Sequence, residues 1–166
     1  MIIKITNYPV GIHDLRFEKT ADELQLGEPF IDNLILDLKL DKSHHQILMS
    51  GNLTISAHLN CDRCNENYKS NFNSDFTLLY LFNQDRIHED DVNVKYLSPK
   101  DDKIDITADV IDYARLSLPM KQLCSEDCKG LCMKCGANLN HSKCSCVNDN
   151  IDPTWEQLKK LKDKLN

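Results

Sequence analysis

The chain has 166 residues, which fits one domain or one domain with a small appendage. Its 20 basic and 26 acidic residues give a net charge of −6, which argues against a general polyanion-binding surface. Residues 1–114 have 11 basic and 20 acidic side chains, a net charge of −9, whereas residues 115–166 have 9 and 6, a net charge of +3. We therefore expect any contact with nucleic acid to lie in the C-terminal third.

The start of the chain, MIIKITNYPV, lacks the charged residues, apolar core and small cleavage-site residues of a secretory signal. The apolar runs are also far shorter than the roughly 20 residues that cross a bilayer. We expect a soluble cytoplasmic protein. In such a reducing compartment, paired cysteines more often bind metal or act in catalysis than form structural disulfides.

Three segments show the period-two alternation of half-buried β-strands. Residues 32–40 place leucines on one face, residues 47–61 alternate over fifteen positions, and residues 68–82 keep the period on even positions. The short connections favour antiparallel pairing, so we predict a strongly twisted antiparallel β-meander. Gly51 interrupts the second strand and indicates either a bulge or a close approach of another group to the backbone.

The flanking segments are less regular. Residues 2–5 (IIKI) and 13–18 (HDLRFE) are candidate short strands, joined by a turn at Pro9 and Gly11, that would extend the sheet. The stretch between Asn83 and Asp102 is polar and acidic, which predicts a solvated loop with one edge strand at its VKYL run.

The period changes to that of a helix after residue 106. Val110, Ile111, Ala114 and Leu118 share one helical face, and Pro119 would end the helix. A second, short helix is expected after Asp152, with Pro153 in its first turn and leucines forming an apolar stripe. We predict an α+β protein with a β-rich domain over residues 1–122 and a cysteine-rich tail over residues 123–166.

Eight cysteines form four close pairs, and six of the eight lie between Leu123 and Val147. Two pairs of thiolates held by tight turns make a tetrahedral zinc site, so four pairs suggest up to two sites. The pairs are Cys61/Cys64, Cys124/Cys128, Cys132/Cys135 and Cys144/Cys146.

The last two pairs form the stronger local signal. Cys132, Cys135 and Gly136 fit a zinc knuckle, because glycine accepts the positive φ that aims backbone N–H groups at sulfur. Cys144 and Cys146 would supply the other two ligands, which requires a turn between them. The alternative is free thiols in a loop-rich tail that has almost no core.

The first two pairs are compatible with a second site that joins the sheet to the chain leaving the helix. Cys61, Cys64, Cys124 and Cys128 would then close a loop of some 60 residues. Two independent free pairs are the main alternative. Cys61 also continues the apolar face of its strand, as a core cysteine would.

The sequence gives no indication of catalysis. Four sulfur ligands leave no open position for the water that catalytic zinc needs, and no nucleophile, base and orienting group occur together. A redox-active Cys-x-x-Cys opens a helix, and neither such pair here does so. The contrasting hypothesis is a thiol-based redox sensor that releases zinc when it is oxidised.

The order of these motifs resembles the YceD family of large ribosomal RNA subunit accumulation proteins. The resemblance rests on CDRC between two long strands, then LPMKQLCSEDCKGLCMKCGANLN, a Cys-x-Cys, and DPTW before a Leu/Lys helix. It implies a non-enzymatic bacterial or plastid factor needed for normal levels or processing of the large-subunit ribosomal RNA.

The expected partner is large-subunit ribosomal RNA, its precursor, or a basic ribosomal protein that the acidic N-terminal part would attract. We expect neither a membrane nor a small-molecule substrate. Seven lysines are candidates for phosphate contacts, with solvated side chains as the alternative for each. They are Lys129, Lys134, Lys143, Lys159, Lys160, Lys162 and Lys164.

Overall fold

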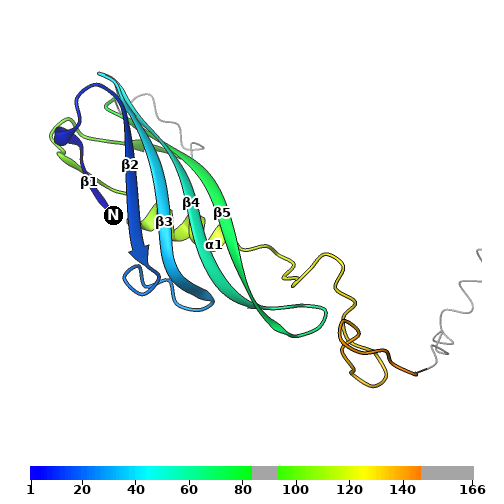
Figure 1. The fold of residues 1–166 in the computed structure, drawn as a ribbon. Helices are drawn as coiled ribbons and strands as arrows, with labels where there is room; N and C mark the ends of the chain where they lie inside the picture. Colours follow the sequence, from blue (N-terminus) through cyan, green and yellow to red (C-terminus); the bar gives the residue numbers. More distant parts are fainter. Residues whose placement is uncertain (84–92, 147–166) are drawn as a thin grey trace, which may run out of the picture.

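A computed structural model describes residues 1–83 and 93–146 of the chain. A five-stranded sheet dominates these residues, and its strands occur in the order in which they follow one another along the chain (Figure 1). Within the described ranges, no helix has the length and apolarity needed to cross a membrane. The strands of the sheet are β2 (Gly11–Thr20), β3 (Phe30–Lys42), β4 (Gln46–Asn60), β5 (Asn67–Leu81) and β6 (Val94–Tyr96).

The first four strands of the sheet pair antiparallel with their neighbours, as the predicted β-meander requires. The register places Leu38 opposite Gly51, and Gly51 opposite Phe76. The leucines of β3 are buried on this face of the sheet, while Asp37 and Lys39 are exposed on the other. Because successive side chains of a strand point to opposite faces, this alternation gives the sheet one apolar and one polar side.

Helix α1 (Thr107–Leu116) packs on the apolar face, where it contacts β4 and β5 (Figure 1). Its buried residues are Val110 and Ala114, as the helical period predicts. The helix ends at Leu116, a little before Pro119. A large sheet with one packed helix, as the described residues show, agrees with the predicted α+β class.

The expectation for the first residues was wrong in part. Strand β2 includes the HDLRFE segment and does extend the sheet, but β1 (Ile2–Lys4) does not. Instead, β1 pairs antiparallel with β7 (Lys103–Asp105) in a separate two-stranded sheet, and a short 3-10 helix follows at Ile5–Asn7. The pairing buries Ile3 against its partner Ile104, so the apolar side chain of this short strand is covered without a place in the main sheet.

The VKYL run does contain an edge strand, because β6 pairs with β5 at the border of the sheet. The pairing is parallel. Lys95 of β6 reaches the apolar face of the sheet, where its Nζ lies 2.5 Å from Oδ1 of Asp109 in α1. The loop predicted just before β6 lies only partly in the described ranges. The helix expected after Asp152 lies outside them.

Gly51 marks a close approach to the backbone, one of the two possibilities that its position in a strand allows. A Cβ at this position would overlap Cζ of Phe76 and lie 2.6 Å from its Cε1. The Phe76 ring lies across Gly51 and stacks on Tyr113 of α1, with 4.8 Å between ring centroids. A small residue in β4 thus lets an aromatic ring connect the sheet to the helix.

We predict that Gly51→Ala lowers the free energy of unfolding by about 1–3 kcal/mol, because the added methyl group overpacks the contact with Phe76. Urea unfolding measures this change. Ser50→Ala, on the exposed face next to it, should change the free energy by no more than about 0.5 kcal/mol. Adding Phe76→Leu should recover part of the loss, and a Gly51→Ala variant as stable as the parent would contradict the packing described.

Candidate metal centres

The turn between β4 and β5 is a tight knuckle that carries Cys61 and Cys64. The N–H of Asn65 donates to the carbonyl oxygen of Cys61 at 2.8 Å, and the N–H of Cys61 donates to that of Glu66 at 2.9 Å. Asn65 has a φ of 57°, a left-handed conformation that asparagine tolerates better than most residues. The two cysteines therefore face the same side at the end of the longest hairpin.

The chain that leaves α1 returns to this hairpin end, as the yellow and orange segment of Figure 1 shows. Asp62, inside the knuckle, binds it at two points. Its N–H donates to the carbonyl oxygen of Gln122 at 2.7 Å, and its carboxylate accepts from the N–H of Gln122 at 2.8 Å. This contact brings the following Cys124 to the knuckle.

Arg63, the other residue between the two cysteines, holds the same segment further along. Its Nη1 donates to the carbonyl oxygens of Glu126 at 3.1 Å and Cys128 at 2.9 Å. Its own carbonyl oxygen accepts from the N–H of Leu131 at 3.1 Å. The two residues that separate the first cysteine pair thus position the second pair.

The first group of cysteines has the geometry of a tetrahedral sulfur site. The Sγ atoms of Cys61, Cys64, Cys124 and Cys128 lie within 4.8 Å of one another, and this group could hold a metal ion. The Sγ atoms of Cys61 and Cys128 are 3.8 Å apart, and those of Cys64 and Cys124 are 3.7 Å apart. A zinc–sulfur distance of about 2.3 Å makes the edge of a tetrahedron about 3.8 Å. Three of the four cysteines are buried, so the group forms a small buried core and also offers a set of sulfur ligands for a metal ion.

The second group repeats the same turn. The N–H of Gly136 donates to the carbonyl oxygen of Cys132, and the N–H of Cys132 donates to that of Ala137, both at 2.8 Å. Gly136 has a φ of 72°, as the sequence predicted for a knuckle. The Sγ atoms of Cys132, Cys135, Cys144 and Cys146 lie within 4.8 Å of one another, with 3.3 Å between those of Cys132 and Cys144.

Backbone N–H groups favour the thiolate form of the first cysteine of each knuckle. The backbone N–H of Cys124, with smaller contributions from those of Cys64 and Arg63, lowers the pKa of Cys61 to about 6. In the second knuckle, the backbone N–H groups of Cys135 and Lys134 lower the pKa of Cys132 to about 6. Because the thiolate is the form that binds a metal, these two sulfurs are ready to act as ligands at neutral pH.

The family model for the large ribosomal RNA subunit accumulation protein YceD matches residues 49–162. The match covers more than half of the chain and includes most of strand β4, all of β5 and both cysteine groups. The chain belongs to the YceD family. No solved structure matches it significantly.

Relatives of this YceD family member occur in plants and in mycobacteria. A chloroplastic YCED homolog 1 of Arabidopsis thaliana, named a large ribosomal RNA subunit accumulation protein, is 29% identical over 91% of this chain and 54% of the relative. An uncharacterized protein of Mycobacterium bovis is 28% identical over 75% of this chain and 60% of the relative. The chain thus spans between about half and three fifths of the length of these two relatives.

Two of the residues that shape the first group of this YceD protein are its Asp62 and Arg63, to which the sequence analysis assigned no role. The Cys-x-x-Cys spacing identifies the ligands but not the contacts of the residues between them. The signal that could have found them is their chemistry, since a carboxylate and a guanidinium inside a turn are suited to binding free backbone groups of another segment.

The seven nominated lysines divide into two sets. Lys129, Lys134 and Lys143 are exposed on the cysteine-rich tail, so their side chains are accessible to a partner. The four lysines from Lys159 onwards lie outside the described residues, and their role remains a prediction.

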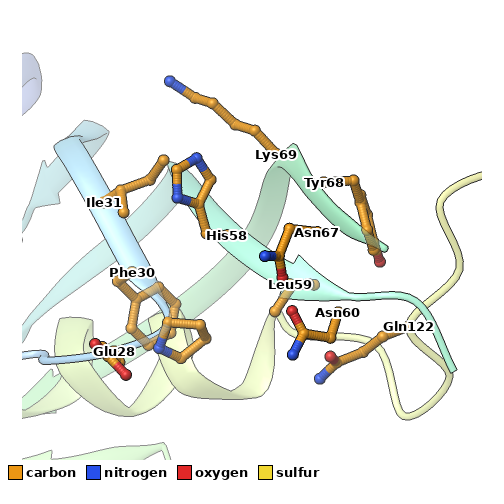
Figure 2. Close-up of a pocket in the computed structure, with 11 residues that line it drawn as sticks. Glu28, Phe30, Ile31, His58, Leu59, Asn60, Asn67, Tyr68, Lys69 and Gln122 are labelled. Carbon is orange, nitrogen blue, oxygen red and sulfur yellow. The ribbon is translucent and has the colours of Figure 1, made fainter. Parts of the chain in front are cut away.

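A groove of about 770 Å³ lies beside the first group, between the start of β3 and the protruding end of the β4–β5 hairpin (Figure 2). Its polar lining includes the amide side chains of Asn60, Asn67 and Gln122. Gln122 belongs to the same contact that brings the tail to Asp62. The groove is therefore bordered by both parts of the chain that the first group joins.

We predict that Arg63→Ala loosens the segment of residues 122–131, because two hydrogen bonds to its carbonyl oxygens are lost. Since Arg63 is exposed, the cost should be about 1 kcal/mol, which corresponds to about fivefold faster local hydrogen exchange. Hydrogen exchange with mass spectrometry measures this rate. Arg16→Ala, which removes an exposed ion pair with Asp37 on the sheet, is the matched control and should leave this segment unchanged. Equal exchange in both variants would show that Arg63 does not hold the segment.

Proposed function

We propose that this YceD protein is a non-enzymatic, zinc-stabilised factor for the accumulation or processing of large-subunit ribosomal RNA, or for assembly of the subunit. We place it in the bacterial cytoplasm. The observation that carries the proposal is the family match, which spans most of the β4–β5 hairpin, the helix and both cysteine groups. The sulfur geometry supports the zinc component independently of that match.

Zinc is the metal that best suits two sets of four thiol ligands, because soft sulfur donors in a tetrahedral arrangement favour it over magnesium or calcium. Cys61, Cys64, Cys124 and Cys128 would hold one ion, and Cys132, Cys135, Cys144 and Cys146 the other. The ions would supply cross-links and no reaction chemistry. The first would join the sheet to the tail, and the second would give the tail a fold that its few apolar residues cannot provide.

A structural role follows from the number of ligands. With four sulfur atoms around each ion, no coordination position is left for water or substrate, as a hydrolytic centre would need. We therefore propose that the protein acts by binding.

We favour RNA as the direct partner. The tail carries the exposed Lys129, Lys134 and Lys143, each directly next to a cysteine of one of the two groups. Each zinc ion with four thiolates would contribute a charge of about −2, so affinity would come from individual lysines and not from the net charge of the tail. A basic ribosomal protein bound to the acidic sheet is the competing possibility.

The metal content of the reduced, purified protein separates structural zinc from redox sensing. We expect two zinc ions per chain, and thiols that stay unmodified in mild peroxide, because metal-bound and buried sulfurs are poorly reactive. Native mass spectrometry and thiol titration measure both quantities. Rapid disulfide formation with release of metal would support the sensor instead.

The RNA proposal predicts that replacing Lys129, Lys134 and Lys143 by glutamate reduces co-sedimentation with large-subunit precursor particles. Losing three phosphate contacts should also reduce, by about 2–3, the magnitude of the slope of the log binding constant against log salt concentration. The matched control replaces Lys4, Lys39 and Lys103, which are exposed on the sheets, by glutamate. Binding that responds equally to both triple variants would contradict a specific role of the tail. Binding lost only in the sheet variant would also contradict it.

A further inference from the structure

The loop between the two cysteine pairs of the second group reaches back to the first group. The side-chain amide of Asn140 makes the contact, as its Nδ2 donates to Sγ of Cys128 at 3.2 Å. Its Oδ1 accepts from the N–H of Lys129 at 2.8 Å, which fixes the direction of the amide. Asn140 therefore directs an N–H group at one of the four sulfurs of a group to which it does not belong.

Further contacts hold the loop in this position. The N–H of Leu139 donates to the carbonyl oxygen of Gly130 at 2.9 Å. Gly130 has a φ of 74°, and a Cβ there would lie 3.1 Å from the carbonyl oxygen of Arg63, so the close approach needs glycine. The chain between the two groups is thus packed directly against the first knuckle.

A second connection runs through Glu66. Its Oε1 lies 2.8 Å from Nε2 of His141, and its Oε2 lies 3.8 Å from Sγ of Cys64. Two neighbouring residues of the loop, Asn140 and His141, therefore connect to two different cysteines of the first group. One contacts a sulfur directly, and the other contacts a carboxylate beside a sulfur.

The ends of this loop are set by the second group. Cys135 precedes the eight residues 136–143 and Cys144 follows them, and the Sγ atoms of both belong to the second group. When the second group is closed, the loop has fewer conformations available, so placing Asn140 against Cys128 costs less conformational entropy. When the second group is open, placing the loop against the first group costs more conformational entropy, which lowers the free energy gained when the first group binds metal.

We propose that Asn140 is a positioning residue for the first centre and that, through it, the two centres bind metal cooperatively. This inference rests on the proposed function only in that both groups bind metal. A hydrogen bond to a thiolate stabilises its charge and orients it, and such outer partners of metal ligands contribute about 10- to 100-fold in metal affinity. Because coupling between sites is reciprocal, each centre should raise the affinity of the other by the same factor.

The first test compares the zinc affinity of the first centre in single variants of the full chain. Occupancy of Cys61 and Cys64 is followed by alkylation and peptide-resolved mass spectrometry as a chelator of known affinity removes zinc. Asn140→Ala should weaken the first centre about tenfold. Asn140→Asp keeps the acceptor for Lys129 but replaces the donor to Cys128 by oxygen, so it should weaken the centre at least as much. Asn73→Ala, an exposed asparagine on the sheet, is the matched control and should have no effect.

The second test is a double-mutant cycle. Replacing Cys132 and Cys135 by serine opens the second centre and should also weaken the first about tenfold. If Asn140 transmits the coupling, adding Asn140→Ala to this background should cause little further loss, because the amide is already displaced. A stability measurement on each variant identifies any that has lost the fold of the sheet.

The outcomes are distinct. Two zinc ions bound with independent affinities, or an effect of Asn140→Ala that is the same with and without the second centre, would overturn the coupling and leave the proposed function intact. An Asn140→Asp variant with the affinity of the parent would overturn the role of the amide. A chain that binds no zinc would overturn both the coupling and the zinc component of the proposed function. A protein whose two zinc sites are coupled but which does not bind ribosomal particles would overturn only the RNA role.

Discussion

The convergence of four sulfur atoms at the end of the β4–β5 hairpin is the constraint that joins the tail to the rest of the chain. The sheet and α1 are held by strand pairing and by an apolar core, but residues 123–146, the described part of the tail, have few buried apolar side chains of their own. Its path is determined where Cys124 and Cys128 meet Cys61 and Cys64, with Asp62 and Arg63 binding the backbone on either side. Without this junction, residues 124–146 would have little to pack against.

The two knuckles solve the same problem with different residues in the decisive position. Each needs a left-handed residue directly after its second cysteine, and the first uses Asn65 where the second uses Gly136. The first lies at the end of a long hairpin and inherits rigidity from fifteen paired positions. Among the described residues, loops flank the second knuckle. Hydrogen bonds from Leu139 to Gly130 and from Asn140 to Cys128 connect the loop that follows it to the first group.

Much of this organisation could be predicted from the sequence, for physical reasons. The long strands show a strict period of two because one face of the sheet is buried. The cysteine pairs stand out because cysteine is the residue that supplies thiolate ligands for a tetrahedral sulfur site. The pairing of β1 with β7 could not be predicted, since three residues with one buried isoleucine are compatible with either sheet. The roles of Arg63 and Asn140 were also hidden. Each acts through two side-chain hydrogen bonds to atoms more than ten residues away, which leave no periodic pattern.

We propose above all that the first group binds one metal ion and thereby joins the sheet to the tail. X-ray absorption at the zinc edge, on a variant in which Cys132 and Cys135 are replaced by serine, tests it most directly because only the first centre then remains. We expect four sulfur neighbours at about 2.3 Å and no nitrogen or oxygen ligand. A centre with fewer than four sulfurs, or a variant without bound zinc whose sheet remains folded, would contradict it.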